Sequence, residues 1–164
     1  MTHGFHLDLS FPSPDQTTAF AAKLAGLLAP GDVILLSGGI GAGKTHFARA
    51  LIQARLAQNG MIEDVPSPTF TLVQTYDDSI CEIWHSDLYR LTHPDEIEEL
   101  GLIDAFETAI CLVEWPDRLG ELTPENALVI EFSTGNASDD PDFRALHLSG
   151  PTEKWESRIR KAIP

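Results

Sequence analysis

The chain has 164 residues, of which 43% are hydrophobic and 22% are charged, as is usual for globular proteins. This length suits one domain with a sizeable core but not two, so we expect a single domain over residues 1–164. Lysine and arginine number 11 against 25 aspartates and glutamates, and the resulting net charge of −14 excludes autonomous binding of DNA or RNA. A simpler explanation of the same acidity is that the net charge keeps the protein soluble.

The hydropathy pattern excludes a membrane span. No stretch approaches the roughly 18 consecutive apolar residues that cross a bilayer. The N-terminus has no basic segment followed by an apolar one, so we expect a cytoplasmic protein. Cys81 and Cys111 are isolated within apolar runs, which favours buried, reduced thiols over a disulfide or a zinc site.

Four elements are expected in the first 60 residues. Apolar and polar residues alternate at the start, as in a half-buried strand, and Ser13 or Asp15 can cap the helix that follows. A short apolar run then precedes a glycine-rich loop and an Ala- and Leu-rich helix closed by Asn59 and Gly60. In chain order, the elements are a strand over 5–11, a helix over about 15–28, a strand over 33–36 and a helix over 44–58.

The second part of the chain mixes short strands with broken helices. Asp77, Asp78 and Ser79 join two strands into a hairpin, and Pro94 with Asp95 marks a helix start. The first expected elements are strands over 70–76 and 80–84, followed by a helix from 94 to about 100 that breaks at Gly101 and resumes through 106. Strands over 110–113, 127–132 and 143–148 come next, with a polar loop over 133–142 between the last two. A C-terminal helix is expected to start at Pro151.

The clearest motif is G-x-x-x-x-G-K-[ST], matched from Gly38 to Thr45 between an apolar strand and a helix. Its glycines let successive backbone N–H groups point at phosphate oxygens, and the helix dipole adds positive potential there. Lys44 should reach the β- and γ-phosphates, and the Thr45 hydroxyl should ligate Mg²⁺. The motif therefore predicts binding of a nucleoside triphosphate with Mg²⁺ by Gly38, Ile40, Gly41, Ala42, Gly43, Lys44 and Thr45.

Two acids follow apolar strands and are candidates for the metal and the attacking water. Glu114 comes directly after Ile110–Val113, so it is expected to ligate Mg²⁺, although a strand-end surface acid would have the same pattern. Asp87 follows a second strand, where an acid can also be a helix cap. Either carboxylate could orient the water. Thr69 could sense the γ-phosphate, or it could be an ordinary strand threonine.

These features predict an α/β fold of the P-loop NTPase class. We expect a central, mostly parallel sheet with an antiparallel hairpin portion and helices on both faces. The site should lie at the carboxyl ends of the parallel strands, where the glycine-rich loop and Glu114 both emerge.

Four segments in order resemble one known family over about residues 15–132. They are Gly41–Thr45, Ser67–Val73 (SPTFTLV), His85–Leu91 (HSDLYRL) and Leu112–Pro116 (LVEWP). This set is similar to the bacterial TsaE family, formerly YjeE, of P-loop ATPases in tRNA threonylcarbamoyladenosine biosynthesis. The resemblance implies ATP hydrolysis that serves protein partners resembling TsaD and TsaB. These partners, rather than this acidic chain, would hold the tRNA.

The resemblance also implies residue roles. Thr45 and Glu114 would hold Mg²⁺, Asp87 would lie at the nucleotide, and Thr69 would belong to a switch-like loop. Thr17, in the first helix, loosely matches a family position near the nucleotide. This chain has Gly39 where the family often has an acid, and its divergence after Phe132 prevents transfer of adenine contacts.

Three functions compete at this stage. The first is a slow, partner-dependent ATPase. The second is a small-molecule kinase, which needs an arginine-bearing lid, for which only Arg90 and Arg118 are available in mid-chain. The third is a nucleotide-gated interaction module in which hydrolysis is incidental.

Overall fold

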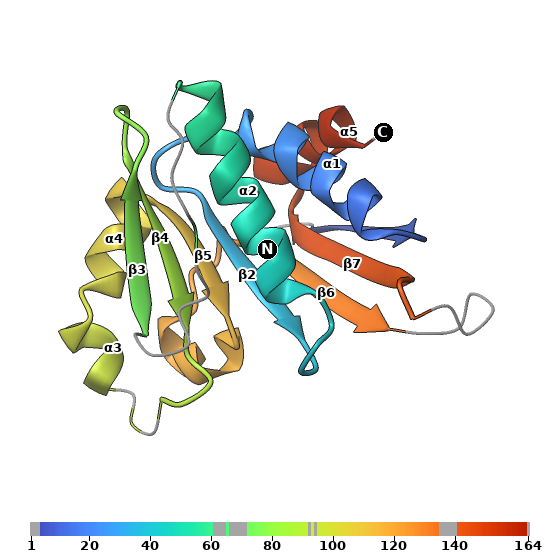
Figure 1. The fold of residues 1–164 in the computed structure, drawn as a ribbon. Coiled ribbons are helices and arrows are strands. Elements are labelled where there is room, and N and C mark those ends of the chain that lie inside the picture. The colour runs from blue at the N-terminus through green and yellow to red at the C-terminus, as the bar shows by residue number, and fades with distance from the viewer. Residues whose placement is uncertain are drawn as a thin grey trace.

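A seven-stranded sheet forms the centre of the computed structural model, which describes residues 4–60, 65, 72–91, 93, 95–134 and 141–163 (Figure 1). Its strands are ordered β1-β7-β6-β2-β5-β4-β3. Their bounds are β1 Gly4–Phe11, β2 Val33–Gly38, β3 Val73–Asp77, β4 Glu82–Asp87, β5 Ile110–Glu114, β6 Leu128–Thr134 and β7 Arg144–Pro151.

The central strands are parallel and both edges are antiparallel. β2 pairs in parallel with β5 and with β6, and β4 pairs in parallel with β5. The predicted hairpin is present as β3 and β4 at one edge. The expected fold class is therefore confirmed, with one addition. β7 runs back beside β6 and then pairs with β1, so a second antiparallel portion forms the other edge.

Helices cover the sheet on both faces (Figure 1). Phe20, Phe47 and Trp155 belong to helices on one face, and Ile97 and Phe106 belong to helices on the other. The first group comprises α1 Pro14–Ala25, α2 Lys44–Gln58, the π-helix η2 Thr152–Glu156 and α5 Ser157–Ala162; the second comprises α3 Asp95–Glu99, α4 Leu102–Thr108 and the 3₁₀-helix η1 Pro116–Leu122. None of the described helices is long and apolar enough to cross a membrane.

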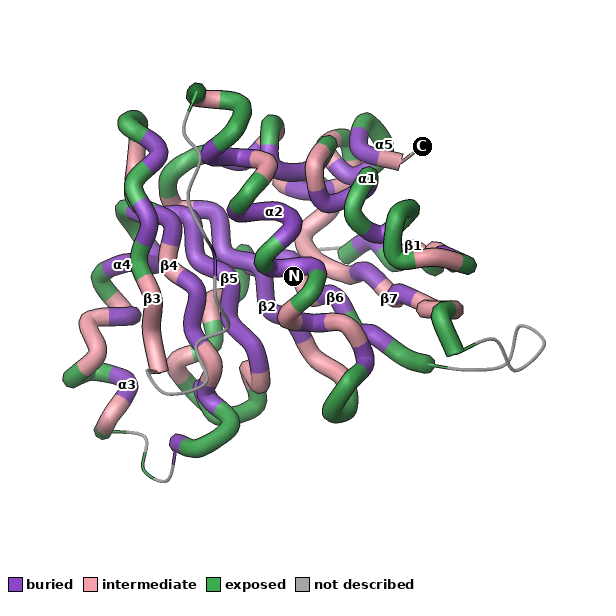
Figure 2. Tube along the Cα trace, in the orientation of Figure 1, coloured by how far each residue is buried: buried purple, intermediate pink, exposed green. Residues whose placement is uncertain are grey.

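Burial on both faces explains the apolar runs of the central strands. Along β2, Ile34 and Leu36 join the core beneath α1 and α2, whereas Val33 and Leu35 join the core beneath α4. β1 instead keeps one exposed face, since Phe5 and Phe11 are buried but Asp8 is exposed (Figure 2). The alternation predicted for residues 5–11 is thus confirmed.

Several helix boundaries differ from the sequence prediction. Helix α1 ends at Ala25 rather than near residue 28, because the chain leaves the helix at Gly26. Ser13 is its N-cap residue, but its side chain makes no capping hydrogen bond. Pro151 ends β7 instead of starting the last helix. The 3₁₀-helix η1 was not predicted; it follows Trp115, whose left-handed backbone (φ 58°) turns the chain.

The two cysteines are free thiols, as predicted. Cys111 is buried in β5, and burial raises the pKa of its thiol to about 12. Cys81 is partly buried, and burial also raises its pKa. Both thiols therefore act as small apolar side chains at neutral pH.

A buried ion pair fastens the β3–β4 hairpin turn to α2. Arg55 Nε lies 2.6 Å from Asp78 Oδ2, and Arg55 Nη1 donates to the carbonyls of Ala25 and Leu28. Burial tends to raise the pKa of Asp78, but hydrogen bonds from the N–H groups of Cys81 and Ile80 and from Arg55 outweigh it. The pKa of Asp78 is therefore lowered from 3.8. The carboxylate form is the one that the fold stabilises.

Replacing Asp78 should destabilise the protein strongly, because Arg55 would keep a buried charge without its partner. We expect Asp78→Ala to lower the free energy of unfolding in urea by about 3 kcal/mol or more. The matched control is Asp77→Ala, which removes an exposed neighbour that accepts one hydrogen bond from Ser79 N–H. Equal effects of the two substitutions would contradict this role.

The same pair predicts a pH dependence. Because the pKa of Asp78 is lowered in the fold, its stabilisation is complete above its ordinary pKa of 3.8 and is lost as the pH falls below it. Between pH 5 and pH 2, the wild-type chain should lose more free energy of unfolding than Asp78→Ala does.

Candidate functional site

The glycine-rich loop connects the end of β2 to the start of α2. Gly38, Gly41 and Gly43 have φ values of 138°, 77° and 109°, which are unfavourable for other residues. At Gly38, an added Cβ would lie 2.5 Å from the carbonyl oxygen of Phe132 on β6. The loop therefore requires glycine both for its backbone turns and for its close approach to β6.

A hollow of about 490 Å³ lies beside this loop and gathers most of the predicted residues. Glu114 and Asp87 reach it from the carboxyl ends of β5 and β4, as expected for a parallel sheet. Its other lining residues are Ile40, Gly41, Ala42, Gly43, Lys44, Thr45, His46, Tyr89, Trp115 and Arg144.

The Lys44 side chain folds back to the start of the glycine-rich loop. Its Nζ donates to the carbonyls of Gly38 and Gly39, the latter at 3.2 Å, and lies 3.6 Å from the centre of the Trp115 ring. Burial lowers the pKa of Lys44 and outweighs the nearby carboxylates, which raise it. Lys44 is therefore a largely buried basic side chain that lines the hollow.

Glu114 is the centre of a buried hydrogen-bond chain. Its side chain is 2% exposed. The Thr45 hydroxyl donates to Oε1 at 2.7 Å, and His85 Nε2 lies 2.7 Å from Oε2. The surface-acid alternative for Glu114 is therefore wrong. The residue lies inside the site, and it connects β5 to α2 and β4.

His85 is a site residue that the sequence reasoning missed. It is fully buried, and because a carboxylate can only accept, its Nε2 must carry the proton donated to Glu114. Its Nδ1 has no hydrogen-bond partner among the described residues. The available signal was position: His85 precedes Asp87 by two residues on β4, directly beside the strand that carries Glu114.

Asp87 ends β4 and is the register partner of Glu114. Its Oδ1 accepts a hydrogen bond from Tyr89 N–H at 3.0 Å. Burial raises the pKa of Asp87, and the neighbouring Glu114 carboxylate adds to that rise. The two acids therefore differ in setting, since Asp87 opens toward the hollow whereas Glu114 is bonded through both oxygens.

Thr17 lies beside a second, smaller hollow of about 110 Å³ on the other side of the loop. This hollow shares Gly43, His46 and Arg144 with the larger one, and Phe132 forms part of its wall. Thr17 is buried in α1. The next residue of that helix, Thr18, forms a 3.1 Å hydrogen bond with His46 of α2. Thr69, the remaining predicted residue, lies outside the described residues.

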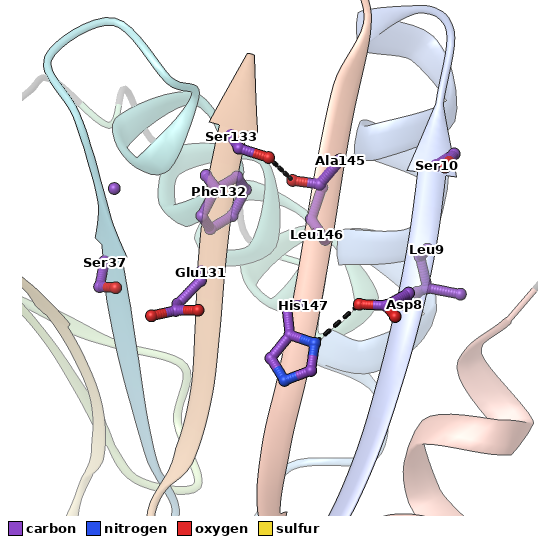
Figure 3. A pocket seen from close by; sticks show the side chains of 11 residues that line it. Asp8, Leu9, Ser10, Ser37, Glu131, Phe132, Ser133, Ala145, Leu146 and His147 are labelled. Atoms are coloured by element: carbon purple, nitrogen blue, oxygen red, sulfur yellow. Dashed lines mark hydrogen bonds and ion pairs between the residues drawn. The ribbon is translucent and has the colours of Figure 1, made fainter. Parts of the chain in front are cut away.

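A third hollow, of about 460 Å³, lies on the face of the sheet away from α1 and α2 (Figure 3). Asp8, Glu131 and His147 project into it from three adjacent strands, and Asp8 accepts a 2.7 Å hydrogen bond from His147. Its described lining includes two carboxylates and neither lysine nor arginine. It would therefore repel a triphosphate, and the glycine-rich loop remains the candidate phosphate site.

Comparison with known proteins identifies the family that carries this arrangement. The sequence model of the family described as "Threonylcarbamoyl adenosine biosynthesis protein TsaE" matches residues 11–141. The chain belongs to the TsaE family. The resemblance found from four motifs is therefore confirmed, and the family match includes the loop, both acids and Thr17.

Individual members of the TsaE family are similar over most of their length. The protein from Rickettsia bellii is 41% identical over 112 residues, which are 68% of this chain and 76% of that protein. The one from Bacillus subtilis is 38% identical over 129 residues, which are 78% and 77% of the two chains. Both are named tRNA threonylcarbamoyladenosine biosynthesis protein TsaE.

A solved structure agrees with the fold. The crystal structure of YdiB from Bacillus subtilis superposes with a TM-score of 0.74 at 27% identity, covering 99% of this chain and 97% of that chain. The family assignment and this superposition together support the P-loop α/β class predicted from the sequence.

The bond between His85 and Glu114 predicts a difference between two substitutions. His85→Leu removes a donor to a buried carboxylate, and hydrogen bonds to charged groups contribute about 1.5–3 kcal/mol. We expect a loss of about 2 kcal/mol in the free energy of unfolding, measured in urea without nucleotide. His85→Gln should lose less, because its side-chain amide can also donate to Glu114.

His93→Leu serves as the control, since the His93 side chain is 66% exposed. Its substitution should change stability by less than about 0.5 kcal/mol. If His85→Gln is as unstable as His85→Leu, the donor to Glu114 does not matter and the assigned role is wrong.

Proposed function

We propose that this TsaE-family protein binds ATP with Mg²⁺ and hydrolyses it slowly in the service of tRNA threonylcarbamoyladenosine formation. The observation that carries the proposal is the meeting of the glycine-rich loop, Lys44, Thr45, Asp87 and Glu114 around one hollow. Loop N–H groups and the start of α2 favour phosphate, and two acids face them from neighbouring strands.

The side chains also suit Mg²⁺. Thr45 Oγ1 and Glu114 Oε1 are oxygen ligands only 2.7 Å apart, and both line the hollow. Mg²⁺ commonly takes one or two protein oxygens and completes its shell with phosphate oxygens and water. Thr45 and Glu114 would hold the ion, which would neutralise charge on the β- and γ-phosphates when bound.

Lys44 and Asp87 have different tasks in the proposed reaction, an in-line attack of water on the γ-phosphate. Lys44 would move from the carbonyls of Gly38 and Gly39 to the phosphates and stabilise the charge that develops on them. Asp87 would orient the attacking water. We assign this task to Asp87 rather than Glu114 because both oxygens of Glu114 already accept hydrogen bonds from Thr45 and His85.

The nucleoside would extend to the other side of the loop. The smaller hollow adjoins Gly43, and Pro14 and Phe132 provide it with apolar surface. Its remaining lining is polar and consists of Thr17, His46, Asp142 and Arg144. A base needs such a surface at a fixed distance from the phosphates. This gives Thr17 the nucleotide-binding role that the family resemblance implied.

We further propose that the protein acts in the cytoplasm with partner proteins resembling TsaD and TsaB. These partners bind the tRNA, and the chain itself contacts the tRNA only indirectly. The net charge of −14 supports this division, because an acidic chain cannot grip a polyanion alone. ATP hydrolysis would then reset the partner complex and would not form the carbamoyl bond.

Substitutions in the site test the proposed chemistry. Lys44→Ala should weaken Mg–ATP binding and slow turnover by about 100-fold or more, since removing a charge stabiliser costs about 3 kcal/mol of the barrier. Asp87→Asn should retain ATP affinity but slow phosphate release by about 100-fold or more. Nucleotide binding is measured by calorimetry, and turnover is measured as phosphate released.

Asp104→Asn is the control for Asp87→Asn, because Asp104 is an exposed acid on α4 and lines neither hollow of the site. Full Mg–ATP affinity and turnover in Lys44→Ala would refute the assignment. Reconstituted tRNA modification with Asp87→Asn separates the two roles of ATP. Repeated modification cycles without hydrolysis would favour the nucleotide-gated module over the ATPase.

A further inference from the structure

Arg144 approaches the glycine-rich loop from a distant part of the chain. It begins β7, 103 residues beyond Gly41, and its Nη2 donates to the Gly41 carbonyl at 3.4 Å. At Gly43, an added Cβ would lie 3.6 Å from Arg144 Nε. The guanidinium thus lies against the outer side of the loop that the sequence assigns to phosphate.

The position of Arg144 is fixed by the sheet. Its backbone pairs with Phe11 on β1 and with Thr134 on β6, so the strand is held on both sides. Its Nη1 donates to the carbonyls of Pro141 and Phe143 at 2.7 and 2.8 Å. The described hydrogen bonds all end on neutral main-chain oxygens. A phosphate oxygen is a stronger acceptor for a guanidinium than any of these.

Arg144 also belongs to both hollows of the site. It lines the larger one together with Lys44 and Thr45, and it lines the smaller one together with Thr17 and Phe132. A nucleotide that spans the two hollows must pass this side chain. The part that passes is the junction between the phosphates and the nucleoside.

The sheet order separates Arg144 from the reacting end. β5 and β4, which carry Glu114 and Asp87, lie on one side of β2, whereas β6 and β7 lie on the other. The γ-phosphate belongs with the acids and the metal. A cation on β7 therefore faces the α-phosphate, the phosphate next to the nucleoside, which takes no part in bond breaking during hydrolysis.

We propose that Arg144 is a second cation of the nucleotide site and binds the α-phosphate of the bound nucleotide. This inference rests on the proposed function and adds to it a positioning residue from the C-terminal part of the chain. A contact to the α-phosphate, which does not react, stabilises substrate and transition state equally, so Arg144 contributes to affinity and not to the chemical step. ATP and ADP should depend on it alike.

The test compares Arg144→Ala, Arg144→Lys and wild type in binding and turnover. Loss of a charge-assisted hydrogen bond should weaken both ATP and ADP by about 10–100-fold, raise KM by a similar factor and leave kcat within about threefold. Arg144→Lys should be intermediate, because lysine keeps the charge without the planar fork. Arg160→Ala is the control, since it removes the same charge from an exposed position on α5.

Three outcomes overturn the inference. One is unchanged nucleotide affinity in Arg144→Ala. Another is a loss confined to ATP, which would place the guanidinium at the γ-phosphate. The third is a kcat that falls with unchanged KM. Unfolding midpoints measured without nucleotide show whether Arg144→Ala has a folding defect. If it has one, the nucleotide affinity of a well-folded Arg144→Lys tests the inference instead, and an affinity equal to that of wild type overturns it. If wild type itself binds no ATP, the proposed function fails rather than the placement of Arg144.

Discussion

The burial of the Glu114 carboxylate is the constraint on which the rest of the site depends. A charge that is 2% exposed needs donors at both oxygens, and they come from different elements. Thr45 supplies one from the start of α2, and His85 supplies the other from β4. These bonds fix the first turn of α2 relative to two parallel strands. The glycine-rich loop, which ends at that turn, therefore has a defined position beside the acids.

The sheet divides the site into two parts with different chemistry. Glu114, His85 and Asp87 come from β5 and β4, and they provide oxygen ligands and a carboxylate near the proposed reacting end. Arg144 and Phe132 come from β7 and β6 on the other side of β2. They offer a cation and an apolar wall, which suit binding rather than reaction. In the proposed complex, the loop between the two parts would contact the nucleotide from its nucleoside to its γ-phosphate.

Charge limits what this chain can do by itself. The chain carries a net charge of −14, and the hollow on the open face of the sheet adds carboxylates without lysine or arginine among its described lining (Figure 3). The positive charges near the loop, Lys44 and Arg144, line one hollow, which suits the small polyanion proposed as its ligand. A long one such as tRNA would meet mostly acidic surface. The family role in tRNA modification thus fits a protein that acts through other proteins.

The sequence alone determined the local features of this protein. The loop from Gly38 to Thr45 is contiguous, so a phosphate-binding role could be predicted for it without a fold. Helix α2 was predicted with its exact bounds, and the apolar runs of β2 and β5 were recognisable because both strands are buried on both faces. Glu114 was predictable because it ends such a run.

Only the tertiary structure decided the contacts between distant segments. His85 lies in a recognised motif, but its bond to Glu114, 29 residues away, could not be predicted, since it comes from the register that puts β4 beside β5. Arg144 and Gly41 are 103 residues apart and meet only because β7 folds back next to β6. The difference between Asp87 and Glu114 likewise depends on which oxygens are already bonded. Side-chain direction and strand register set these contacts, and neither is encoded in the spacing of residues along the chain.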